Sequence, residues 1–213
     1  MSRTESAMLE LGTVAPAFEL TDAIGGKAFS RDDVVALSWD ETLSDQENAS
    51  GTGKKHGLLV MFVCPHCPYV KHIEAELGRL GRDYFGTNGG GPIAIVAINS
   101  NDLMAYPQDG PDQMREQAGA FGWTFPYLLD ESQEVAREYK AACTPDFFLF
   151  DAELKLVYRG QLDDSRPRRG DFGNDVPVTG KDLRAAMDAV IAGKPPVAEQ
   201  RSSIGCNIKW RES

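Results

Sequence analysis

The segment FVCPHCPYV, residues 62–70, holds two cysteines three positions apart, and a proline directly follows each of them. A pair of this kind, Cys64 and Cys67, can exchange electrons through a reversible disulfide, and the thiolate is the reactive form of such a residue. The chain has four cysteines in 213 residues, which is too few for a disulfide scaffold. A close pair therefore favours redox chemistry, with inert core packing and metal binding as the alternatives.

The two prolines indicate which cysteine begins the helix that follows. Proline suits the first helical position, where its missing N–H costs nothing, but deeper in a helix it loses a hydrogen bond and clashes with the preceding turn. If Cys64 capped the helix, Pro68 would fall at the fourth position and could not bond back to the Cys64 carbonyl. If Cys67 caps it, Pro68 takes the first position. We therefore predict that Cys67 is the thiolate at the helix N-terminus, with Cys64 beside it on the strand side.

A metal site in this segment would draw on Cys64, His66 and Cys67. These residues could ligate one ion only by crowding a single turn, and a closed tetrahedral site normally needs a second ligand pair at a separate position. We therefore predict no metal site, and we predict no cofactor for the chain.

The rest of the chain alternates between apolar runs typical of buried strands and apolar residues at helical spacing. The order calls for an α/β fold with a central mixed β-sheet flanked by helices, in a single domain over residues 1–213. An N-terminal extension precedes the sheet, an exposed polar loop is expected at residues 40–57, and residues 194–213 form a C-terminal tail. The predicted strands are residues 18–20, 28–30, 58–63, 92–98, 125–129, 146–150 and 154–158, and the predicted helices are residues 68–84, 111–121, 132–140 and 179–192.

Charge and hydropathy exclude some classes of partner. The net charge of −10 and the pI of about 4.8 argue against nucleic acid or an anionic membrane as the main partner. No apolar run approaches the roughly 18 residues that span a bilayer. The N-terminal residues lack the apolar core and basic flank of a signal peptide, so we expect a cytoplasmic protein.

A second informative segment is Ala142-Cys-Thr-Pro-Asp-Phe-Phe-Leu-Phe150. A proline directly before a strand, here Pro145, can have a cis peptide bond that fixes a tight turn into the strand. It can also be an ordinary trans proline at the start of an edge strand. An apolar strand, a cysteine pair at the start of a helix, and Thr144-Pro145 before a hairpin together resemble the thioredoxin fold.

The resemblance is closest to the AhpC/TSA-like redoxins, and in particular to peroxiredoxin-like proteins whose site is Cys-x-x-Cys-Pro-Tyr-Val-Lys. It covers roughly residues 10–210. The matching segments are the longer N-terminal region, residues 99–102, residues 125–151, the Tyr158–Arg166 segment and the Gly205-Cys-x-Ile-Lys-Trp210 tail.

This resemblance implies thiol–disulfide exchange, with Cys67 and Cys64 as the redox pair and Thr144-Pro145 as the loop that holds the substrate backbone. The implied partners are a protein or small-molecule disulfide or thiol and a cellular thiol reductant, and the implied role is antioxidant. Counted from Phe62 as in thioredoxin, Cys67 falls at the attacking position, and Val70 stands where the resolving cysteine would be.

The sequence lacks the residue pattern that peroxiredoxins carry before their peroxidatic cysteine. Peroxiredoxins place a proline and a threonine seven and three residues before the peroxidatic cysteine. Before Cys67 these positions hold Val60 and Cys64, and before Cys64 they hold Gly57 and Met61. A weak thiol peroxidase is therefore one alternative function. A thioredoxin-fold module that binds a metal or a partner peptide without redox turnover is another.

Three further residues are auxiliary candidates. Cys143 lies two residues before Pro145, so it could approach the cysteine pair, although core packing is its other explanation. Cys206, in the apolar end of the tail, could resolve a disulfide as a mobile thiol or could simply seal an edge of the domain. His66 could lower the pKa of the thiolate as an imidazolium, or it could be a solvated histidine in a turn.

Overall fold

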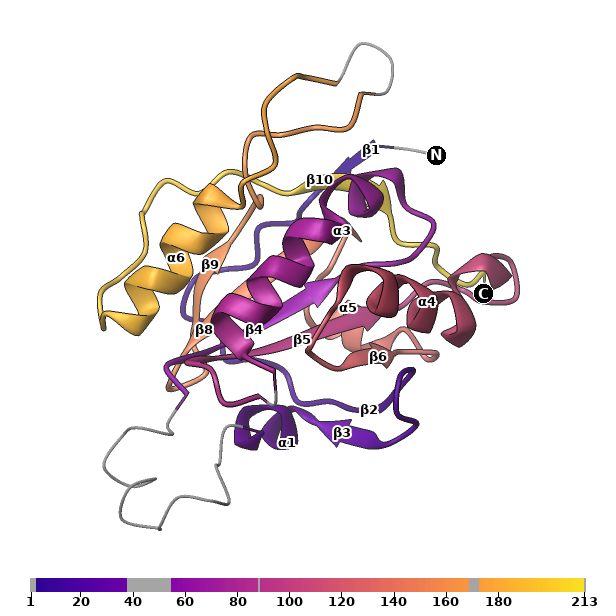
Figure 1. Ribbon diagram of the computed structural model, residues 1–213, viewed down its shortest axis with the longest axis horizontal. Helices are drawn as coiled ribbons and strands as arrows, with labels where there is room; N and C mark the ends of the chain where they lie inside the picture. The colour runs from indigo at the N-terminus through magenta and orange to yellow at the C-terminus, as the bar shows by residue number, and fades with distance from the viewer. Residues whose placement is uncertain (1–2, 38–54, 88, 169–172, 213) are drawn as a thin grey trace.

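A seven-stranded mixed sheet forms the centre of the protein, in the order β3-β2-β6-β5-β4-β8-β9 (Figure 1). The computed structural model describes residues 3–37, 55–87, 89–168 and 173–212. Every residue of the parallel pair β4 and β5 is buried, which explains why both strands are continuous apolar runs in the sequence. The strands are β2 (Glu19–Asp22), β3 (Ala28–Ser30), β4 (Gly57–Phe62), β5 (Ile93–Asn99), β6 (Tyr127–Leu129), β8 (Asp146–Asp151) and β9 (Leu156–Arg159).

Helices cover both faces of this sheet, as the alternating pattern predicted. Successive residues of β4 point to opposite faces, so that Leu59 joins one layer of core and Leu58 the other. The first layer lies between the sheet and α3, α4 and α6, and the second lies against α1 and α5. The helices are α1 (Arg31–Ala36), α3 (Pro68–Leu80), α4 (Pro111–Phe121), α5 (Glu134–Glu138) and α6 (Lys181–Ile191), with a π-helical turn at Gly81–Phe85 and a 3-10 turn at Pro107–Asp109.

A second, three-stranded sheet joins the two ends of the chain. It contains β1 (Arg3–Glu5), β10 (Ile204–Asn207) and the two-residue strand β7 (Cys143–Thr144), with β10 in the middle. Both pairings are antiparallel. In Figure 1 the strands β1 and β10 run together past the N-terminal end of α3. The predicted tail therefore contains a strand that packs against the residues directly before Pro145.

The strands of this small sheet and helix α1 were not predicted, because segments of two to six residues carry too little periodicity. The equally short strands predicted at residues 18–20 and 28–30 were instead indicated by the glycine turn between them. The helix predicted to reach residue 84 ends as an α-helix at Leu80 and continues as the π-helical turn. Most of the loop predicted at residues 40–57 lies outside the described residues. Its last residues are described, and there Lys55 is buried and Gly57 begins β4. No helix among the described residues is both long and apolar enough to cross a bilayer.

Candidate active site

Cys67 stands at the N-cap of α3, and Pro68 occupies the first helical position. The cysteine has an extended backbone with φ −67° and ψ 122°, and the helix bonds begin behind it, where Lys71 N–H donates to the Cys67 carbonyl. The structure thus confirms the helix start that the prolines predicted. The sulfur lies at the end of the helix where N–H groups are unpaired and the dipole is positive, which favours a thiolate.

Thr144 connects the two cysteines. Its hydroxyl oxygen lies 3.4 Å from the Sγ atom of Cys64, and its carbonyl oxygen accepts a hydrogen bond from Cys67 Sγ at 3.1 Å. The two cysteine sulfurs are also hydrogen-bonded to each other. The peptide bond between Thr144 and Pro145 is cis. Residues from the end of β4, the start of α3 and the loop before β8 therefore meet at one point. This is the arrangement that the family resemblance implied for Cys64, Cys67, Thr144 and Pro145, and their catalytic roles stay a prediction.

The surroundings give the two cysteines opposite acidities. Burial by itself raises the pKa of Cys67, but hydrogen bonds from Cys206, Cys64 and Thr144 outweigh it and hold that pKa well below its ordinary value. Burial also raises the pKa of Cys64, and its hydrogen bond to Cys67 and the negative charge of Asp109 raise it further. Cys67 is therefore the more acidic of the two thiols and the more readily deprotonated.

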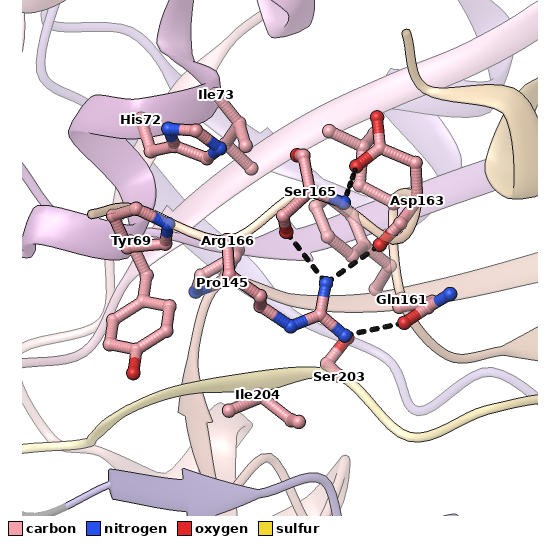
Figure 2. Close-up of a pocket in the computed structure, with 13 residues that line it drawn as sticks. Tyr69, His72, Ile73, Pro145, Gln161, Asp163, Ser165, Arg166, Ser203 and Ile204 are labelled. Atoms are coloured by element: carbon pink, nitrogen blue, oxygen red, sulfur yellow. Dashed lines mark hydrogen bonds between the residues drawn. The ribbon is translucent and has the colours of Figure 1, made fainter. Parts of the chain in front are cut away.

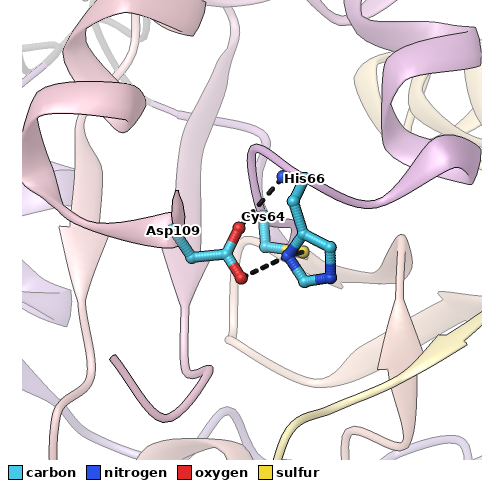
Figure 3. A group of neighbouring side chains, drawn as sticks. All are labelled: Cys64, His66 and Asp109. Atoms are coloured by element: carbon cyan, nitrogen blue, oxygen red, sulfur yellow. Dashed lines mark hydrogen bonds and ion pairs between the residues drawn. The ribbon is translucent and has the colours of Figure 1, made fainter. Parts of the chain in front are cut away.

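His66 is paired with a carboxylate that the sequence analysis did not identify (Figure 3). Its Nδ1 lies 2.5 Å from Asp109 Oδ2, and its backbone N–H donates to Asp109 Oδ1 at 3.0 Å. Only 10% of the His66 side chain is exposed, so it is not the solvated turn histidine that was one alternative. Its Nδ1 lies 4.0 Å from Cys64 Sγ, which places the ring beside Cys64. No sequence motif marks Asp109, because it is 43 positions away in a short 3-10 turn.

The Cys64 thiol, the His66 ring and the Asp109 carboxylate could together hold a metal ion. One ligand atom from each lies within 4.8 Å of the others. The sequence had suggested Cys64, His66 and Cys67 as possible ligands, and the structure places Asp109 where Cys67 was considered. Three protein ligands correspond to an open site, since a closed tetrahedral zinc site takes four. Asp109 already accepts from Asn101 at 2.8 Å as well as from His66, so an ion would have to replace part of this network.

The two remaining cysteines differ in what they contact. Cys143 is buried, its Sγ donates to the Pro145 carbonyl at 3.5 Å, and burial raises its pKa well above the ordinary value. These contacts are those of a packed core thiol. Cys206 lies on β10 directly opposite Thr144 and is hydrogen-bonded to Cys67. The tail therefore brings a third thiol to the cysteine pair.

A pocket lined in part by Pro145 lies between the first turns of α3 and the segment that follows β9 (Figure 2). Tyr69 and His72 line it from α3, and Ser203 and Ile204 line it from the tail. The guanidinium of Arg166 donates to the carbonyls of Asp163 and Ser165 at 2.7 Å and to the Gln161 side chain at 2.5 Å. These bonds hold the segment after β9 in place as one wall of the pocket.

Comparison with known families agrees with this geometry. The model of the AhpC/TSA family matches residues 11–159, which include the cysteine pair and the cis-proline loop. The chain belongs to the AhpC/TSA family. No curated protein matched this AhpC/TSA member in a sequence search.

Two solved structures resemble this AhpC/TSA protein over its whole length. An uncharacterised conserved protein from Geobacillus kaustophilus has 47% sequence identity and a TM-score of 0.83, with 100% of this chain and 98% of that chain covered. A hypothetical protein from Sinorhizobium meliloti has 43% identity and a TM-score of 0.81, with 99% and 100% covered.

A more distant structure shows the fold class of this AhpC/TSA protein. The thioredoxin domain of a thiol-disulfide oxidoreductase from Bacteroides vulgatus has 17% identity and a TM-score of 0.50, with 71% of this chain and 88% of that chain covered. The fold is therefore thioredoxin-like, as the resemblance in the sequence implied.

Proposed function

We propose that this redoxin is a thiol–disulfide oxidoreductase in which Cys67 attacks the substrate and Cys64 resolves the intermediate. The observation that carries the proposal is the position of Cys67 at the N-cap of α3, with a pKa held well below its ordinary value. A lowered thiol pKa at a helix N-terminus is the property that makes a cysteine a nucleophile. The thiol–disulfide oxidoreductase with the same fold supports the reaction class.

The first step is attack by the Cys67 thiolate on one sulfur of a substrate disulfide. The new bond joins Cys67 to that sulfur, the substrate S–S bond breaks, and the other substrate sulfur leaves as a thiolate. Thr144-Pro145 lies next to the attacking sulfur, where its backbone can hold the substrate chain. The product is a mixed disulfide between Cys67 and the substrate.

The second step is attack by Cys64 on the Cys67 sulfur of the mixed disulfide. The first step removes the negative charge of Cys67, and that charge is one of the causes that raise the pKa of Cys64. Formation of the mixed disulfide therefore makes Cys64 easier to deprotonate. The products are a Cys64–Cys67 disulfide and the second substrate thiol, and a cellular thiol reductant would restore the dithiol.

Release of glutathione from oxidised glutathione tests the proposal. The reduced full-length chain is mixed with one equivalent of oxidised glutathione, quenched with acid and mapped by mass spectrometry. We expect glutathione release, an initial adduct on Cys67, and loss of the reaction in Cys67→Ser. Cys143→Ala, another buried cysteine close by, serves as the matched control and should react like the wild type. An adduct that forms first on Cys64, or full reactivity of Cys67→Ser, would contradict the proposal.

Peroxide reduction is a second candidate reaction, supported by the AhpC/TSA family match. The proline and threonine of the peroxidase pattern are missing from both cysteine positions. We therefore expect one equivalent of hydrogen peroxide to leave Cys67 reduced over seconds. Stoichiometric oxidation of Cys67 to the sulfenic acid or a disulfide within that time would instead establish peroxidase chemistry.

Metal binding is the non-enzymatic candidate, and the cluster of Cys64, His66 and Asp109 favours it. Thiol titration separates it from redox turnover. If a divalent metal protects both cysteines from alkylation, and neither ever forms a disulfide under mild oxidation, the chain is a binding module. Disulfide formation at Cys67 in the absence of metal supports the oxidoreductase.

A further inference from the structure

The tail strand β10 pairs with the residue that precedes the cis-proline. Cys206 lies opposite Thr144, and Asn207 lies opposite Cys143, in an antiparallel pairing. The approach is close, because a Cβ atom on Gly205 would lie 2.0 Å from the Thr144 carbonyl oxygen. Only glycine fits at that position without a shift of the backbone. The tail is thus built to run directly along the cis-proline loop.

This is the place where the proposed function puts a substrate. The cis-proline loop is expected to hold the substrate backbone, and the sulfur that exchanges with Cys67 must lie in contact with it. Cys206 meets both conditions: its backbone pairs with Thr144, and its thiol is hydrogen-bonded to Cys67. The tail therefore presents a cysteine to the nucleophile in the geometry required of a substrate.

The same strand covers the nucleophile. The exposed fraction of Cys67 is 0% and that of Cys64 is 1%. Just before Cys206, Ser203 and Ile204 line the pocket that Pro145 also lines (Figure 2). An external disulfide can reach Cys67 only after something moves, and β10 lies over the cis-proline loop where that substrate would lie.

Bonds on both sides of β10 keep Cys206 in place. Ser6 N–H donates to the Ser203 carbonyl at 2.9 Å, and Lys209 N–H donates to Asn101 Oδ1 at 2.8 Å. Cys206 is therefore held beside Cys67, within hydrogen-bond reach of its sulfur. The position that holds the resolving cysteine in thioredoxin is occupied here by Val70, so any resolving thiol must come from elsewhere in the chain.

We propose that β10 is an internal substrate, in which Cys206 forms a reversible disulfide with Cys67 and so resolves mixed disulfides in addition to Cys64. The inference rests on the proposed function, because it needs Cys67 as the nucleophile. In the reaction, Cys67 first forms a mixed disulfide with an external disulfide RSSR and releases one RS⁻. Cys206 then loses its proton and attacks the Cys67 sulfur, which forms the Cys67–Cys206 bond and releases the second RS⁻. Two thiols of the chain are oxidised, and one external disulfide is reduced to two thiols.

The test removes Cys64 so that only Cys206 can resolve. Full-length Cys64→Ser is reduced, mixed with one equivalent of oxidised glutathione, quenched with acid and mapped under non-reducing conditions. We expect about two glutathione thiols released per chain and a Cys67–Cys206 disulfide. In Cys64→Ser/Cys206→Ser we expect about one released and a stable glutathione adduct on Cys67. Cys64→Ser/Cys143→Ala is the matched control and should behave like Cys64→Ser alone.

The wild-type chain provides a readout without any substitution, since limited oxidation should yield both Cys64–Cys67 and Cys67–Cys206 linkages. A glutathione adduct that persists on Cys67 in Cys64→Ser, as it does in the double variant, would overturn the role of Cys206 and leave the attack by Cys67 intact. Absence of thiol release from every variant, the wild type included, would overturn the proposed function and the internal substrate together.

Discussion

The carbonyl oxygen of Thr144 lies 3.1 Å from the sulfur of Cys67, and the same residue is paired across the small sheet with Cys206. One residue of the cis-proline loop thus contacts both the candidate nucleophile and the strand that covers it. This relationship makes the reactivity of Cys67 depend on the tail, because any opening of β10 also changes the hydrogen bonds that lower the pKa of Cys67.

The opposite acidities of the two cysteines predict their order of alkylation. At slightly acidic pH iodoacetamide should label Cys67 before Cys64, because the pKa of Cys67 is held well below its ordinary value and the pKa of Cys64 is raised well above it. Cys67 is 0% exposed and Cys64 1%, so exposure does not favour either residue. Timed labelling followed by peptide mapping measures the order, and earlier labelling of Cys64 would contradict the assignment.

Asp109→Asn should change the pKa of Cys64 more than the pKa of Cys67. The substitution removes a negative charge that raises the pKa of Cys64, so the alkylation profile of Cys64 should shift to lower pH. It also replaces an acceptor of the Asn101 amide, at a cost of roughly 1–3 kcal/mol in the free energy of unfolding. Asp112→Asn, at an exposed carboxylate of α4, is the matched control and should change neither quantity. An unchanged Cys64 profile in Asp109→Asn would show that this charge does not act on the thiol.

Gly205→Ala should expose Cys67. The new Cβ atom cannot fit against the Thr144 carbonyl, so β10 must shift away from β7. If the pairing is weakened by roughly 1.4 kcal/mol, alkylation of Cys67 through local opening should become about tenfold faster. Gly119→Ala is the control, since a Cβ there meets no atom within 4 Å. Labelling that is no faster in Gly205→Ala than in this control would show that β10 does not limit access.

Asp146 predicts a pH dependence of stability. Burial raises the pKa of this carboxyl from 3.8 to about 7. Between these two values the folded state keeps a proton that the unfolded chain has released, so the free energy of unfolding should fall as pH rises. The fall ends near pH 7 and amounts to at most roughly 4 kcal/mol, at about 1.4 kcal/mol for each pKa unit.

Denaturant unfolding at about pH 5 and about pH 8 measures this dependence. Asp146→Asn cannot titrate, so its unfolding free energy should change less between the two conditions than that of the wild type. Asp32→Asn is the control, because the Asp32 side chain is 76% exposed, and it should keep the slope of the wild type. Equal slopes for Asp146→Asn and the wild type would contradict the raised pKa.

Much of the fold around the cysteines could be predicted from residues whose effects are local in the sequence. The missing N–H of Pro68 sets the start of α3, and the unbroken apolar runs of β4 and β5 indicate strands buried on both faces. The residues around Pro145 left its peptide bond open between cis and trans, and the family resemblance implied that Thr144-Pro145 is the loop that faces the cysteines. These features are local, because a few neighbouring residues determine backbone conformation through sterics and hydrogen bonding.

The partners of the cysteines are long-range features. Asp109 reaches His66 across 43 positions, and Thr144 reaches Cys67 across 77. Cys206 is brought to the same point by β10, a strand of four residues with no periodicity to predict it. The sequence by itself therefore determined which cysteine begins the helix. Only the tertiary structure decided which groups surround that cysteine, because pKa and access depend on burial and on contacts between segments far apart in the chain.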